Sequence, residues 1–164
     1  MSEYSYIKLN RYMHLHKKLS KICVFLCRAI TLLIYVFYPA YLIYLFFCEK
    51  PLFVVNTLVP LISVILLSFL RAKINLQRPY EAMDITPLYN KKTVGKSFPS
   101  RHTFAIFIIA FSVMTFNLPL GFAITLLGIL LAILRVLLGV HYVRDVLVGF
   151  LFAVISALIG YVII

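Results

Sequence analysis

Five long apolar runs restrict the fold of this chain more than any other feature. Each run is close to the length of about 20 residues that an α-helix needs to cross the hydrocarbon core of a bilayer. The predicted spans cover residues 22–47, 52–70, 100–116, 120–138 and 145–164. We therefore predict an all-α fold, a polytopic membrane helix bundle with about five transmembrane helices.

The composition supports a membrane protein and argues against a nucleic-acid partner. The chain is 63% hydrophobic with a mean hydropathy of +1.03, whereas ordinary globular domains are close to half apolar. Its net charge of +11 comes from 16 Lys and Arg against 5 acidic residues. Because most of the basic residues lie outside the apolar runs, anionic headgroups or phosphate-bearing lipids are the partners that we expect.

The first 21 residues differ from the rest of the chain. They carry five basic residues and a single acid, Glu3. This composition is too polar to span a bilayer and is typical of an amphipathic helix at the membrane surface. We therefore divide the chain into a basic interfacial segment, residues 1–21, and a membrane-embedded domain, residues 22–164.

The cysteines predict neither a metal site nor a cofactor. Cys23 and Cys27 are one helical turn apart and Cys48 ends the same apolar run. No second pair of ligands matches them, as a metal site would require. In an apolar run a cysteine behaves as a small hydrophobe.

The order of the spans predicts that the polar residues gather at one end of the bundle. The end of the second span, the start of the third, the end of the fourth and the start of the fifth all lie on the same side. This side carries Arg71, Arg78, His102, Arg135, His141 and Asp145. The short connections on the opposite side offer only Glu49 and Lys50.

His141 and Asp145 are the first candidate pair for chemistry. They are spaced i, i+4, so on a helix they share a face and the carboxylate can hold the imidazole. A nucleophile or base held by an orienting group has this arrangement. The alternative is a capped helix start, with Asp145 near the positive N-terminal end of the last span.

The basic residues before the third span suggest phosphate binding. Arg71 and Arg78 are two helical turns apart and point the same way if the second helix continues to Pro79. Arginine binds phosphate through paired hydrogen bonds. For Lys91, Lys92 and Lys96 the positive-inside rule is a sufficient explanation.

A loop becomes a helix at Pro99, Ser100, Arg101 and His102. A helix N-terminus offers free backbone N–H groups to an anion. His102 is placed there to donate a proton to a leaving oxygen. A histidine at a helix start is alternatively a surface or capping residue.

These residues form three ordered segments. Arg71 is followed after six residues by Arg78-Pro79; Pro99-Ser100-Arg101-His102 comes next; Arg135, His141 and Asp145 are separated by five and three residues. Together the segments resemble the signature of the phosphatidic acid phosphatase type 2 superfamily, over about half of the chain. That family includes membrane lipid phosphatases, polyprenyl diphosphate phosphatases and soluble vanadium haloperoxidases, and the spans exclude the last group.

The chain departs from the family pattern at three positions. Arg71 stands where lysine is usual, Arg101 where glycine is commonest, and Leu134 where a serine usually precedes the arginine. Arg101 would then add a phosphate contact, and Leu134 removes a hydroxyl. Members commonly have six spans, one more than the count here.

The resemblance implies a mechanism without a metal or other cofactor. His141 would attack phosphorus and form a phosphohistidine, Asp145 would hold its ring, and His102 would protonate the departing oxygen and later activate water. The residues implied in phosphate binding are Arg71, Arg78, Ser100, Arg101 and Arg135.

The expected substrate is a lipid phosphate that enters from the bilayer. The sequence leaves open whether it is a phosphomonoester or a diphosphate such as undecaprenyl diphosphate. The alternative from another class is a non-catalytic membrane protein that binds anionic headgroups.

The side of the membrane on which the site lies is also open. Relatives commonly work on the outer face of the cell membrane. The basic residues of segment 1–21 and of the 71–99 loop place the same end in the cytoplasm by the positive-inside rule.

Overall fold

The computed structural model describes residues 3–83, 85–89 and 94–163. All of the regular secondary structure in these residues is helical and none of it is strand, which confirms the predicted all-α class. The helices are α1 (Glu3–Leu15), α2 (Lys17–Cys48), α3 (Lys50–Ile74), α4 (Pro79–Ala82), α5 (Arg101–Met114), α6 (Leu118–Leu137) and α7 (Val143–Leu158), and a π-helical turn, Ile159–Ile163, follows α7.

Four helices in the described part of the chain, α2, α3, α6 and α7, are long and apolar enough to cross a membrane. The third predicted span, residues 100–116, is the exception. It forms the 14-residue helix α5, which at 1.5 Å per residue is about 21 Å long and shorter than a hydrocarbon core of about 30 Å. Most of its residues are buried, against α6 and α7 above all. The protein is therefore a multi-pass membrane protein with α5 at its centre.

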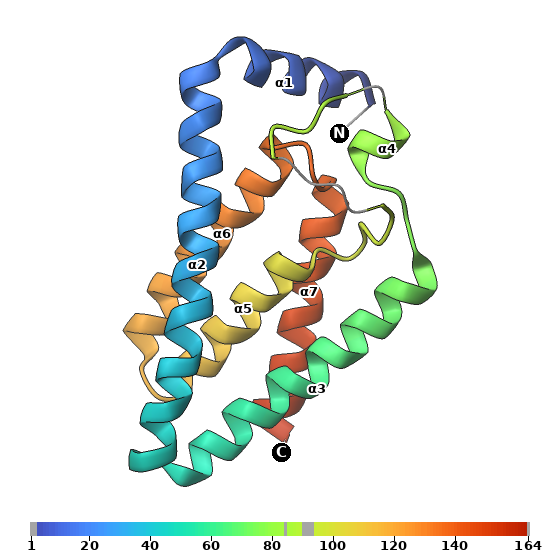
Figure 1. Ribbon diagram of the computed structural model, residues 1–164. Coiled ribbons are helices and arrows are strands. Elements are labelled where there is room, and N and C mark those ends of the chain that lie inside the picture. Colours follow the sequence, from blue (N-terminus) through green and yellow to red (C-terminus); the bar gives the residue numbers. More distant parts are fainter. Residues whose placement is uncertain (1–2, 84, 90–93, 164) are drawn as a thin grey trace.

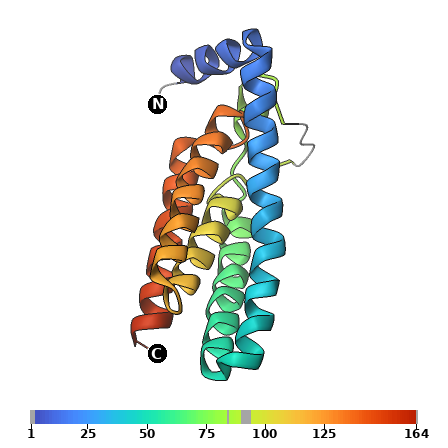
Figure 2. The same ribbon diagram turned by 90° about the vertical axis from the view of Figure 1, so that its left-hand side faces the viewer.

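Helix α1 lies across one end of the bundle, nearly at right angles to α2 (Figures 1 and 2). The segments that join α3 to α5 and α6 to α7 lie at this same end, whereas the α2–α3 connection and the C-terminus lie at the other (Figure 1). This arrangement confirms the predicted gathering of the polar segments. The interfacial helix ends at Leu15 and α2 begins at Lys17, so the predicted boundary at residue 21 lies inside α2.

Helix α3 does not continue to Pro79, so the condition under which Arg71 and Arg78 would share a helix face is not met. It ends at Ile74 because Asn75 takes a left-handed conformation, with φ of +44°. Asparagine is among the few residues that tolerate this conformation. Its side-chain Oδ1 accepts a hydrogen bond from the Lys96 amide at 3.2 Å. The chain then runs in extended form to Arg78, the N-cap of α4.

Helices α5 and α7 touch each other at the site end through their backbones. A Cβ atom on Gly149 would lie 2.7 Å from the Ser100 carbonyl oxygen, so only glycine fits without displacement. The Ser100 amide also donates a hydrogen bond to the Asp145 carbonyl oxygen at 2.8 Å. The first turn of α5 is thereby fixed against the first turn of α7.

Candidate active site

His141 and Asp145 meet, although not on a continuous helix. Helix α7 begins at Val143 with Tyr142 as its N-cap, so His141 lies in the preceding turn. Asp145 folds back over the helix start, and its Oδ2 accepts a hydrogen bond from the Tyr142 amide at 3.1 Å and lies 3.4 Å from His141 Nδ1. The same carboxylate therefore caps the start of α7 and lies against the His141 ring.

Ser97 is a further partner of this carboxylate. Its hydroxyl donates to Asp145 Oδ2 at 2.5 Å, and both side chains are completely buried. The sequence analysis missed Ser97, because 48 positions separate it from Asp145 and no local pattern links them. The loop before α5 thus helps to hold the group that orients His141.

Arg71, in the last turn of α3, binds this loop through its guanidinium. It donates to the carbonyl oxygens of Lys96, Ser97 and Pro99, the Ser97 contact being 3.3 Å long. The side chain is buried, at 8% exposure. A guanidinium presents five N–H donors in a plane, so it can hold carbonyl groups and still face an anion.

Arg78 links the same loop to the His141 turn. Its Nε donates to the Gly95 carbonyl and its Nη1 to the Val140 carbonyl, each at 3.2 Å. The two arginines therefore converge because Asn75 turns the chain and the loop bends back over them. A continuous helix is not needed.

Glu81 holds Arg78 and the loop together and was also missed by the sequence analysis. Its Oε2 accepts from the Arg78 amide and its Oε1 from the Gly95 amide, each at 2.7 Å. A glutamate three residues after the N-cap is the spacing of a capping box. That local signal predicts the first contact, but the second depends on the fold.

A cavity of about 270 Å³ lies among these groups. It brings together five of the predicted site residues, and His141 lies beside five basic or titratable side chains, which come from α3, from α5 and from the segment that joins them. The lining residues are Ser68, Arg71, Arg78, Val94, Gly95, Lys96, Arg101, His102 and His141. Lys96, for which the positive-inside rule had seemed sufficient, is one of them. Lys91 and Lys92 lie outside the described residues.

Two other predicted phosphate ligands do not line this cavity. Ser100 is completely buried, and its Oγ accepts a hydrogen bond from the Thr103 hydroxyl at 3.0 Å. Arg135 is 1% exposed. Its Nη2 lies 3.5 Å from Thr31 Oγ1 on α2, and its Cζ lies 5.6 Å from the ring centre of Tyr89, which belongs to the segment between α4 and α5. Asp145 lies behind His141 as an orienting group would.

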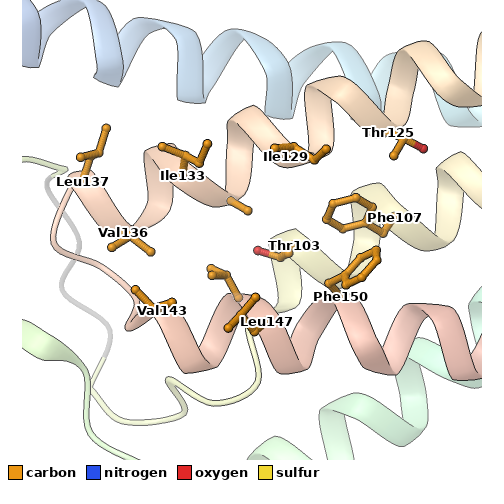
Figure 3. A pocket seen from close by; sticks show the side chains of 12 residues that line it. Thr103, Phe107, Thr125, Ile129, Ile133, Val136, Leu137, Val143, Leu147 and Phe150 are labelled. Carbon is orange, nitrogen blue, oxygen red and sulfur yellow. The ribbon is translucent and has the colours of Figure 1, made fainter. Parts of the chain in front are cut away.

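A separate apolar groove of about 520 Å³ lies between α5, α6 and α7 (Figure 3). Its lining carries no ionisable side chain; Thr103 and Thr125 are its polar members. The close contact between Gly149 and Ser100 packs α5 against α7 beside it. The ionisable side chains therefore line the arginine-containing cavity, whereas the groove is apolar.

Comparison with known proteins agrees with the three segments. The family model of the PAP2 superfamily matches residues 52–164, well over half of the chain. The chain belongs to the PAP2 superfamily. The resemblance predicted from the sequence is confirmed, and the matched region contains every side chain that lines the cavity.

Individual PAP2 relatives support the same assignment. The bacitracin transport permease protein BcrC of Bacillus licheniformis is 36% identical over 87 residues, which cover 51% of this chain and 43% of that protein, so the match spans less than half of the relative. LpxE from Aquifex aeolicus has a TM-score of 0.71 and 29% identity, over 85% of this chain and 84% of that one. A phosphatidylglycerolphosphate phosphatase from Bacillus subtilis also has a TM-score of 0.71, at 21% identity over 98% of this chain and 84% of that one, and shows the common fold.

Proposed function

We propose that this protein is an integral-membrane lipid phosphatase that hydrolyses a phosphomonoester or a diphosphate of a lipid through a phosphohistidine on His141. The observation that carries the proposal is the cavity itself. His141, oriented by a buried carboxylate, faces the same space as His102 and the guanidinium groups of Arg71, Arg78 and Arg101. A site for phosphoryl transfer needs a nucleophile, a proton donor and fixed positive charge.

In the first step His141 attacks phosphorus. Because Asp145 lies against Nδ1, the lone pair for attack is on Nε2. A P–N bond forms, the bond from phosphorus to the lipid oxygen breaks, and its electron pair leaves with that oxygen. His102 supplies the proton that the oxygen needs. Asp145 stabilises the positive charge that develops on the His141 ring.

In the second step water attacks the phosphohistidine. His102, now neutral, takes a proton from the water as the P–N bond breaks, and inorganic phosphate leaves. The arginines hold the equatorial oxygens throughout, and this preorganised charge is the term that contributes most in such reactions. Since it comes from side chains, we expect turnover without an added metal.

The substrate's tail would leave the cavity along α3. Ser68 lines the cavity one turn before Arg71, and its neighbours Ile65 and Phe69 are 58% and 70% exposed. An exposed apolar helix face of this kind contacts lipid in a membrane protein. We therefore propose that the lipid reaches the cavity sideways from the bilayer, with its phosphate placed among the arginines.

The test is phosphate release by the detergent-purified protein from a panel of lipid monophosphates and diphosphates with excess EDTA. We expect release by the wild type and its loss in His141→Ala, while His16→Ala, which removes an exposed histidine of the α1–α2 junction, keeps the wild-type rate. Full activity in His141→Ala would refute the nucleophile. Lipid binding without release would favour a non-catalytic binding protein, and the relative rates would separate monoesterase from diphosphatase.

A further inference from the structure

Helix α1 lies outside the segment that matches the family, yet it contacts the candidate site directly. It crosses the site end of the bundle, over the connection between α6 and α7 (Figures 1 and 2). One face is buried against the bundle through Tyr6, Asn10 and Met13, at 3%, 6% and 2% exposure. These three residues are spaced three and four apart, as the buried face of a helix requires.

The Tyr6 hydroxyl reaches the backbone of the proposed nucleophile. It lies 3.1 Å from the His141 carbonyl oxygen and 3.2 Å from the Val136 carbonyl oxygen, and it is the donor to both. Its ring also packs on Tyr142, with ring centres 5.8 Å apart. Tyr6 therefore connects the last turn of α6 to the turn that precedes α7.

The donor role of Tyr6 is fixed by its surroundings. Burial raises the pKa of the Tyr6 hydroxyl, and the neighbouring Tyr142 and Asp145 raise that pKa further. The hydroxyl accordingly keeps its proton under any ordinary assay condition. Both of its partners are carbonyl groups, which only accept.

Asn10 strengthens the same contact one turn further along α1. Its Nδ2 donates to the Thr86 carbonyl oxygen at 3.2 Å. The same nitrogen packs on Gly139, and a Cβ atom added to that glycine would lie 3.1 Å from it. Gly139 has a φ of +77°, a conformation that glycine adopts without strain. The turn between α6 and α7 is thus covered by α1 on one side and bound to Arg78 through Val140 on the other.

We propose that Tyr6 is a positioning residue of the phosphatase: α1 holds the backbone of His141 so that its imidazole stays against Asp145 and aligned with the cavity. The inference rests on the proposed function. The positioning role follows from the place of His141, which lies in a turn between α6 and α7. Its backbone is therefore not held by the hydrogen bonds of a helix of its own. A nucleophile displaced by even about 1 Å loses much of its rate.

The experiment compares kcat and KM of wild type, Tyr6→Phe and Tyr12→Phe in the phosphate-release assay. Tyr12 is on the same helix but 51% exposed, which makes it the matched control. We expect Tyr6→Phe to lower kcat about tenfold, because loss of the hydrogen bond to the His141 backbone lets the imidazole move out of alignment, with KM unchanged and phosphoenzyme formation slowed equally. Tyr12→Phe should retain both constants.

Met13→Ala separates positioning from simple destabilisation. Met13 is buried under the same helix, but its side chain is apolar and donates no hydrogen bond. Truncation should therefore lower Tm, while kcat per folded molecule stays within about twofold of the wild-type value. An unchanged kcat in Tyr6→Phe, or an equal loss of kcat in Met13→Ala, would overturn the positioning role. Absence of release by the wild type would instead refute the phosphatase assignment.

Discussion

Removal of the Ser97 hydroxyl tests whether the carboxylate behind His141 is held for catalysis. Ser97→Ala deletes the 2.5 Å hydrogen bond to Asp145 Oδ2 and leaves the contacts of that oxygen with the Tyr142 amide and the His141 ring. The site is completely buried, so water does not replace the lost donor freely. The carboxylate is then held less firmly, by the Tyr142 amide, the His141 ring and the 3.7 Å ion pair of its Oδ1 with Arg144.

The expected magnitude follows from the charge on the acceptor. A hydrogen bond to a charged group contributes about 1.5–3 kcal/mol. The part of this contribution that is equal in the ground state and in the transition state does not change the rate. If about half is present only when the His141 ring is charged, loss of the hydrogen bond raises the barrier by ~0.7–1.5 kcal/mol. This corresponds to a kcat lower by about three- to tenfold. Asp145→Asn, which removes the charge, should cost considerably more.

The assay is steady-state phosphate release, with folded protein counted by its phosphoenzyme burst. Ser63→Ala is the control, because Ser63 is a buried serine of α3 about 12 Å along the helix from Arg71. We expect wild-type kcat for the control and unchanged KM for both variants. A wild-type kcat in Ser97→Ala would show that this hydrogen bond serves only the fold, and the reasoning would fail.

Two further predictions concern packing and orientation. Gly149→Ala places a methyl group 2.7 Å from the Ser100 carbonyl oxygen and should destabilise the protein by about 1–3 kcal/mol, which lowers Tm by several degrees. Gly128→Ala, whose methyl group meets an aromatic side chain at 3.1 Å, should lower Tm less. Equal Tm values for the two variants would contradict the contact between Gly149 and Ser100. Cys48 is exposed at the end of the bundle opposite the cavity, whereas Val94 is 85% exposed at the cavity. An impermeant maleimide should therefore label Cys48 of the wild type and Val94→Cys in a Cys48→Ser background from opposite sides of the membrane. Labelling of Val94→Cys in intact cells assigns the site to the outer face, labelling only after permeabilisation assigns it to the cytoplasm, and labelling of both positions from one side would refute the topology.

The membrane class and the order of the helices follow from the sequence because hydropathy is a local property. A run of about 20 apolar residues can cross lipid as a helix, in which the backbone groups find their hydrogen-bond partners within the same segment. Counting the runs then places the ends that carry Arg71, His102 and His141 on one side, and the fold confirms this. Hydropathy also identified α5 as an apolar helix, but its length of 14 residues and its burial between α6 and α7 were decided by packing.

Contacts between distant segments were decided by the tertiary structure alone. A continuous helix would have placed Arg71 and Arg78 on one face, but they converge because Asn75 ends α3 and the loop binds both guanidinium groups. Arg135 belongs to a predicted segment, yet the rotation of α6 directs it towards α2. No local pattern specifies the rotation of a helix among its neighbours.

The positions of Ser97 and Tyr6 show most clearly where sequence reasoning ends. Sequence spacing alone suggested the partnership of His141 with Asp145, since four residues on one chain segment are necessarily close. Ser97 and Tyr6 reach that same pair across 48 and 135 positions, through a loop and an interfacial helix that composition describes only as polar and basic. Short sequence segments identify the residue types that the chemistry requires. The contacts that hold these residues in place depend on packing between distant segments, which only the folded molecule brings together.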